Sequence, residues 1–208
     1  MCIICISPKG VKQPSEKLIR TMFRNNPDGA GYMVANGETV RIEKGFMTVD
    51  DLLRSLRQEA FCADDAVVYH FRISTQAGVN PEMTQPFPYS GKLENMRKIE
   101  TETQLGIAHN GIIPCTTDRN DHEYSDTARF ITQYLTEIIE CYADLKDQDV
   151  LDYLLRLTRS KLAFLDPYGR FYTVGHFIKK NGLLFSNSSY EVPRFTFADV
   201  DFDRLYRR

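Results

Sequence analysis

The sequence predicts an α+β protein with antiparallel sheets. Short apolar runs lie toward both ends of the 208-residue chain, and segments with helical periodicity are grouped between them. Strands and helices that segregate along a chain are typical of α+β folds, whereas strict alternation favours a parallel sheet. Asn-Gly turns between short alternating segments indicate hairpins, and hairpins pair strands antiparallel. We therefore expect a layered fold in a single domain spanning residues 1–208.

The strands follow from short apolar or alternating runs bounded by turn residues. Asn36-Gly37 is the strongest hairpin signal in the chain. The predicted strands are 2–7, 32–35, 39–43, 66–73, 105–109, 161–165, 170–174, 176–180 and 183–186.

The helices follow from amphipathic spacing and from capping residues at their starts. They are predicted over 15–24, 48–60, 125–141 and 150–157. The charged segment 91–103 is expected to be a solvated hairpin or loop, and the tail 195–208 is expected to pack along the body.

Composition excludes several classes of protein. The chain is 42% hydrophobic and 26% charged with a net charge of −2, and no basic stripe suggests a nucleic-acid surface. No apolar run approaches the roughly 20 residues of a membrane span, and the first residues do not form a signal peptide. We expect a cytoplasmic protein with reduced thiols. The five cysteines and four histidines lack the spacing of a disulfide framework or a metal site, so neither metal nor cofactor is expected.

Cys2 is the most informative residue. If Met1 is removed, Cys2 carries a thiol and a free α-amino group, which together form a nucleophile and its general base. An α-amino group has a pKa of about 7.7–8.0, so a useful fraction is unprotonated near neutral pH. Position alone also fits a cysteine that has no catalytic role.

Arg72 lies in an apolar strand context, where an arginine is costly unless it meets an acid. That acid is either a substrate carboxylate or an internal aspartate or glutamate. Asn110 and Gly111 end an apolar strand, and their N–H groups form either an oxyanion hole or a plain hairpin turn. Asp126 follows the predicted cap Ser125, where it either binds a substrate ammonium or only favours the helix dipole.

Together these residues predict a site for an amino acid with a reactive side-chain carbonyl. Glutamine fits, because its α-groups could be clamped while its amide carbon meets the thiol.

Six spaced elements resemble class II glutamine amidotransferases, which belong to the N-terminal-nucleophile hydrolases. They are Cys2, Asp28-Gly-Ala-Gly31, His70-x-Arg72-x-x-Thr75, Gln85-Pro86-Phe87, His109-Asn110-Gly111 and Ser125-Asp126-Thr127. The resemblance spans residues 2–127 and implies a four-layer α-β-β-α sandwich of two antiparallel sheets.

The resemblance also implies residue roles. Cys2 would be the nucleophile with its own amine as base, and Asn110 with Gly111 would hold the oxyanion. Arg72 and Asp126 would bind glutamine's carboxylate and ammonium, and Thr75 would line the same pocket. Independently of the resemblance, we expect His109 to belong to the substrate site and to brace the oxyanion turn. Ile3, Ile73, Gln76 and Ala128 depart from the family pattern and leave the choice of substrate open.

Three hypotheses therefore remain at the level of sequence. The first is a glutaminase that releases ammonia and could supply it to a separate synthase. The second is a hydrolase of another γ-glutamyl amide, and the third is an inactive scaffold of the same fold.

Overall fold

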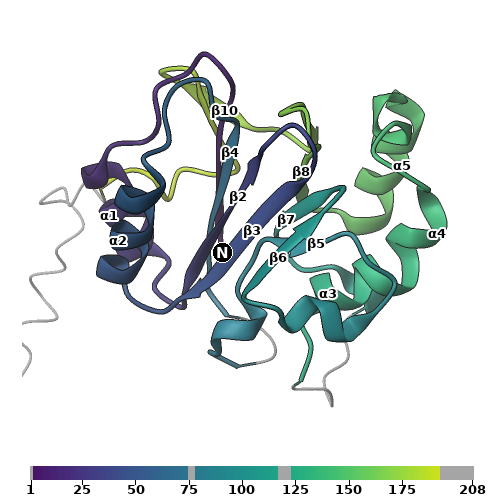
Figure 1. The fold of residues 1–208 in the computed structure, drawn as a ribbon. Coiled ribbons are helices and arrows are strands. Elements are labelled where there is room, and N and C mark those ends of the chain that lie inside the picture. Colours follow the sequence, from purple (N-terminus) through teal and green to yellow (C-terminus); the bar gives the residue numbers. More distant parts are fainter. Residues whose placement is uncertain (1, 75–77, 117–122, 193–208) are drawn as a thin grey trace, which may run out of the picture.

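The fold contains two antiparallel sheets with helices packed beside them (Figure 1). It is a computed structural model that describes residues 2–74, 78–116 and 123–192. The larger sheet has seven strands in the order β10-β11-β1-β4-β2-β3-β6, and the smaller has four in the order β5-β7-β8-β9. The prediction of an α+β protein with antiparallel sheets is confirmed.

The seven-stranded sheet joins the beginning of the chain to its later part. Its strands are β1 (Ile3–Ser7), β2 (Ala30–Ala35), β3 (Val40–Phe46), β4 (Val67–Phe71), β6 (Glu100–Thr103), β10 (Ile178–Lys180) and β11 (Leu183–Phe185). Strand β1 lies between β4 and β11, with Ile3 opposite Phe71 and Cys5 opposite Phe185. Helices α1 (Glu16–Asn25) and α2 (Val49–Glu59) pack beside this sheet, at the left of Figure 1.

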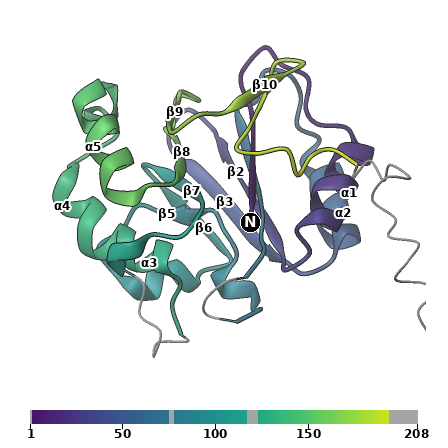
Figure 2. The ribbon, with the colours of Figure 1, turned by 180° about the vertical axis from the view of Figure 1, so that it is seen from behind.

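The four-stranded sheet consists of β5 (Phe87–Pro88), β7 (Gly106–Asn110), β8 (Lys161–Leu165) and β9 (Phe171–Val174). The face of this sheet that points away from the larger sheet is covered by α3 (Asp126–Phe130), α4 (Thr136–Ile138) and α5 (Gln148–Thr158). These helices lie at the left of the reverse view in Figure 2. Short 3₁₀ turns complete the connections: η1 (Pro81–Met83), η2 (Leu93–Arg97), η3 (Pro114–Thr116) and η5 (Asp144–Lys146).

Three apolar clusters hold these elements together. One packs α1 and α2 against the larger sheet and includes Met22 and Tyr69. A second joins the two sheets, where Val68 of β4 and Ala163 of β8 belong to one cluster. The third packs α3 and α5 against the smaller sheet. Alternate residues of β1 and β4 divide between the first two clusters, which is why both strands are apolar apart from Ser7 and His70.

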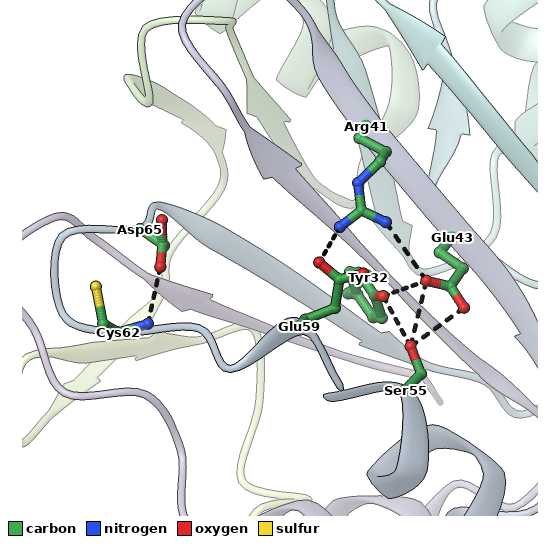
Figure 3. Close-up of polar contacts among 7 residues, drawn as sticks. All are labelled: Tyr32, Arg41, Glu43, Ser55, Glu59, Cys62 and Asp65. Atoms are coloured by element: carbon green, nitrogen blue, oxygen red, sulfur yellow. Dashed lines mark hydrogen bonds and ion pairs between the residues drawn. The ribbon is translucent and has the colours of Figure 1, made fainter. Parts of the chain in front are cut away.

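A polar network fastens α2 to the larger sheet (Figure 3). The Tyr32 hydroxyl donates to Glu43 and lies 2.8 Å from the Ser55 hydroxyl, which donates to both carboxylate oxygens of Glu43 at 3.1 and 3.2 Å. Arg41 forms ion pairs with Glu43 and Glu59. We call these five residues the α2 network. Cys62 and Asp65, drawn in the same figure, form a separate turn.

The caps predicted at Thr48 and Ser125 are confirmed, and Ser15 forms a further cap that was not predicted from the sequence. Ser15, Thr48 and Ser125 each accept a hydrogen bond from a backbone N–H in the first turn of their helix. Asn181 and Gly182 both have positive φ angles, as a tight hairpin turn requires.

Two predictions were wrong in part. Segment 91–103 is not simply a solvated loop, because η2 buries Met96 and β6 pairs with β3 at the sheet edge. Helical structure from 126 ends at Ile138 rather than 141 and contains a wide turn over Ile131–Leu135. The predicted tail 195–208 lies outside the described residues.

Candidate functional site

Cys2 lies just before β1, where pairing with β4 brings it beside Ile73. The Ile73 N–H donates to the Cys2 Sγ at 3.3 Å, and the thiol lies 3.5 Å from the Ile73 carbonyl oxygen. Asn187, which follows β11, donates its side-chain N–H to the Cys2 carbonyl oxygen at 2.7 Å. Strands on both sides of β1 therefore fix the position of the thiol.

The electrostatics of the thiol are set by opposing causes. Burial raises the pKa of Cys2 above its ordinary value, and this outweighs the Ile73 N–H and the charge of Arg72, which both lower that pKa. A raised pKa means that the thiol is mostly protonated at neutral pH. A nucleophilic role therefore requires a general base beside it.

Arg72 follows β4 directly, and only 4% of its surface is exposed. Its backbone N–H donates to Gly29, and its carbonyl accepts from Asp28. Burial lowers the pKa of Arg72 from its ordinary value, whereas the charges at Cys2, Asp28 and Asp126 raise it. The guanidinium remains a cation, because arginine does not lose its proton in proteins.

Asp126 begins α3 and is only 5% exposed. Its Oδ2 accepts from the Ile113 N–H at 2.7 Å, and its Oδ1 accepts from the Thr127 N–H at 2.8 Å. The carboxylate thus braces the turn after β7 as well as facing Arg72. Asp126 can stabilise the start of α3 and still accept a hydrogen bond from a substrate ammonium, because each carboxylate oxygen has more than one acceptor site.

His109 is a buried brace under the turn after β7. Its Nδ1 lies 2.8 Å from the Thr127 hydroxyl and its Nε2 lies 2.9 Å from the Ser160 hydroxyl. Its backbone N–H donates to Gln85 Oε1 at 2.7 Å. Burial lowers the pKa of His109 to about 4, so the ring is neutral and one nitrogen donates while the other accepts.

The conformation at Gly111 requires glycine. Its φ is +151°, and a Cβ there would lie 2.4 Å from the Ser160 Cβ. The backbone at this turn can therefore approach Ser160 more closely than any other residue type would allow.

Asn110 has unused hydrogen-bonding capacity. Its Nδ2 donates to the Ser186 Oγ at 2.8 Å, and the same oxygen accepts from the Ile4 N–H at 2.9 Å. The Asn110 Oδ1 is buried and has no hydrogen-bond partner among the described residues. Rotating the amide by half a turn would let the Ser186 hydroxyl donate to Oδ1 and would direct Nδ2 to the opposite side.

Two cavities adjoin Cys2. The smaller, which we call the clamp cavity, measures about 20 Å³, which is room for about one water molecule. It is lined by Cys2, Arg72, Ile73, Met83, Gln85, His109, Gly111, Ser125, Asp126 and Thr127. A ligand larger than water would have to displace side chains here, and the flexible Met83 is suited to such movement.

The larger cavity, which we call the outer cavity, measures about 550 Å³. It is lined by Cys2, Ile73, Asn110, Gly111, Ile112, Leu155, Arg159, Ser160, Lys161, Gly175, His176, Ser186 and Asn187. Cys2, Ile73 and Gly111 belong to both walls, so the thiol lies where the two cavities meet.

The structure brings together six of the seven residues singled out from the sequence: Cys2, Arg72, His109, Asn110, Gly111 and Asp126. Thr75 lies outside the described residues. Sequence reasoning missed Ser160, Ser186 and Asn187, because serine and asparagine near strand ends carry no signal that distinguishes a site from a turn.

In the described part of the chain, no group of three or more His, Cys, Asp or Glu side chains is placed to hold a metal ion. No helix among the described residues is long and apolar enough to cross a bilayer. Neither a protein-family model nor a curated protein matches this chain.

Proposed function

We propose that this protein is an N-terminal cysteine amidohydrolase that releases the amine from the side-chain amide of L-glutamine or a related γ-glutamyl compound. One observation carries the proposal: the Cys2 thiol lies at the junction of a cavity lined by Arg72 and Asp126 and a second cavity lined by Asn110. An amino acid bound by its α-groups on one side would present its amide carbon at the thiol.

The arrangement of the core supports the fold that the resemblance implies. The three apolar clusters lie between four successive layers, which are helices, the larger sheet, the smaller sheet and helices. This order is consistent with the four-layer α-β-β-α sandwich of class II glutamine amidotransferases.

The proposed reaction begins after Met1 is removed. The free α-amino group of Cys2 takes the thiol proton, through one water, and the thiolate attacks the amide carbon. The C–N bond breaks, the amine leaves with that proton, and a γ-glutamyl thioester remains on Cys2. Water then cleaves the thioester, giving glutamate and restoring the thiol.

Asn110 and Gly111 would stabilise the negative oxygen of each tetrahedral intermediate. The Gly111 N–H and the Asn110 Nδ2, once Ser186 donates to the other end of that amide, are the two donors of an oxyanion hole. Ser186 is then a positioning residue, because it acts only through the orientation of Asn110.

The deciding experiment is intact-mass spectrometry before and after treatment with 6-diazo-5-oxo-L-norleucine, followed by peptide mapping. We expect loss of Met1 and one adduct on Cys2, with the exposed Cys62 unmodified. Retention of Met1 and no adduct would favour the inactive scaffold instead. Transfer of ammonia to a separate synthase remains a prediction.

A further inference from the structure

The outer cavity is much larger than the reaction of glutamine requires. Ammonia is about the size of water, which occupies about 30 Å³ in the liquid, whereas this cavity measures about 550 Å³. That volume lies in the range of roughly 300–1,000 Å³ that is usual for small-molecule sites. The cavity begins at Cys2 and Asn110, so a group within it would adjoin the bond that breaks.

The charge of the outer cavity has one sign. Arg159, Lys161 and His176 lie on its wall, and none of the described residues that line it is an aspartate or glutamate. Lys161 donates from Nζ to the Ser186 carbonyl oxygen, which holds its ammonium beside the end of β11. Guanidinium and ammonium groups without a carboxylate beside them favour an anionic ligand.

The wall also offers apolar surface. Leu155 is 41% exposed and Ile112 is 51% exposed, and both line this cavity. Single exposed apolar residues are common on protein surfaces. Here, however, the two share one concave wall with the basic side chains, which suits a ligand with both an apolar part and a negative charge.

We infer that the substrate is a γ-glutamyl amide of an amino acid or short peptide, whose released amine occupies the outer cavity with its carboxylate near Arg159 and Lys161. This inference rests on the proposed function and specifies its substrate. The chemistry is unchanged: the γ-glutamyl C–N bond breaks, the thiol proton goes to the leaving amine, and water later releases glutamate.

The test compares three substrates on the processed, full-length protein. They are L-glutamine, γ-L-glutamyl-L-leucine and γ-L-glutamyl-L-leucinamide, which differs from the second only in lacking the carboxylate. We expect kcat/KM for the acid to exceed that for the leucinamide and for glutamine by about tenfold, because only the acid offers a carboxylate to Arg159 and Lys161. Equal values for the acid and the leucinamide would overturn the inference.

A pair of variants tests whether Arg159 is responsible for the preference for the acid over the leucinamide. Arg159→Gln should reduce the ratio of acid to leucinamide about two- to fivefold, because Arg159 is exposed and its interaction is partly screened. Arg156→Gln, on the same helix but outside the cavity wall, should leave that ratio unchanged. An Arg159→Gln ratio equal to that of the parent would also overturn the inference.

The inference and the proposed function fail in distinguishable ways. If the diazo analogue labels Cys2 and glutamine is hydrolysed while the acid has no advantage, only the inference is wrong. If Cys2 is not labelled and none of the three compounds is hydrolysed, both are wrong.

Discussion

Two polar clusters in the part of the chain that the structure describes, the α2 network and the Cys2 site, differ in how completely their groups pair. In the α2 network, the Tyr32 hydroxyl, the Ser55 hydroxyl and the Glu43 carboxylate bind one another, and Arg41 bridges to Glu59 (Figure 3). None of these side chains lines the clamp cavity or the outer cavity. At the Cys2 site, by contrast, the thiol belongs to both walls and Asn110 retains a buried oxygen without a partner.

We propose that this contrast separates polar groups that stabilise the fold from polar groups that bind a ligand. Leaving a buried polar atom unpaired costs about 1–3 kcal/mol. The α2 network avoids that cost within itself, whereas the Asn110 amide does not. We therefore expect substitutions in the first cluster to change the free energy of unfolding, and substitutions in the second to change turnover.

The largest effect is expected for Cys2→Ala. Removing the nucleophile should reduce glutamate release by about 10⁴-fold or more, with little change in thermal stability because Cys2 lies outside the strand. Cys62→Ala, which removes an exposed thiol, is the matched control and should behave like the parent. Glutamate release by Cys2→Ala at the parental rate would contradict the proposed mechanism.

The next effect is expected for Asn110→Ala. Loss of one oxyanion donor should lower kcat about 10²- to 10³-fold with a smaller change in KM. The control is Asn95→Ala, since the Asn95 amide also donates to a serine hydroxyl at 2.8 Å but lies outside both cavities. Steady-state kinetics on both variants decide the matter, and equal kcat values would mean that Asn110 only supports the turn.

In the α2 network, Tyr32→Phe should destabilise the protein by about 1–3 kcal/mol, because the partly buried Glu43 loses the hydrogen bond from the fully buried Tyr32. Tyr153→Phe provides the control, since Tyr153 is 48% exposed. Urea unfolding gives the free energies, and kcat should be unchanged in both variants. A fall in kcat without a fall in stability would remove the distinction between the clusters.

The smallest expected effect on turnover accompanies a dependence of stability on pH. Burial lowers the pKa of His109 from 6.5 to about 4, so the unfolded chain binds this proton at higher pH than the folded protein. Stability should therefore be constant above about pH 6.5 and fall below it, by up to about 1.4 kcal/mol per pH unit for this histidine.

Urea unfolding between pH 5 and 7 measures that slope. His70, whose pKa burial lowers to about 3, adds a similar contribution in the same range. His109→Gln should reduce the slope, whereas His176→Gln, at an exposed position, should not. The same slope in the parent and in His109→Gln would show that His109 is not the group responsible.

Much of the fold could be predicted because its signals are local. The cap at Ser125 and the hairpin at Asn36-Gly37 depend on neighbouring residues alone. The edge strand β6 was missed because it is polar on its exposed face, and its pairing with β3 is a long-range contact that periodicity does not reveal.

The residues of the candidate site also divide into those that could be recognised from the sequence and those that could not. Cys2 was recognisable from its place after Met1 and Arg72 from its apolar strand, whereas Asp126 is an ordinary first-turn residue and was singled out through the family resemblance. Ser186 and Asn187 were not, because their importance arises only when β11 pairs with β1 and brings them beside the first residues of that strand.

The pairing of β1 with β11 also determines when, during synthesis of the chain, the residues around Cys2 gain their hydrogen-bond partners. Ile4 and its hydrogen-bond partner Ser186 are 182 residues apart in sequence. At synthesis rates of about 5–20 residues per second, that separation takes roughly 10 to 35 s to complete. During this interval β1 lacks its neighbour β11, so Ser186 and Asn187 can hold the residues around Cys2 in place only after they have been synthesised.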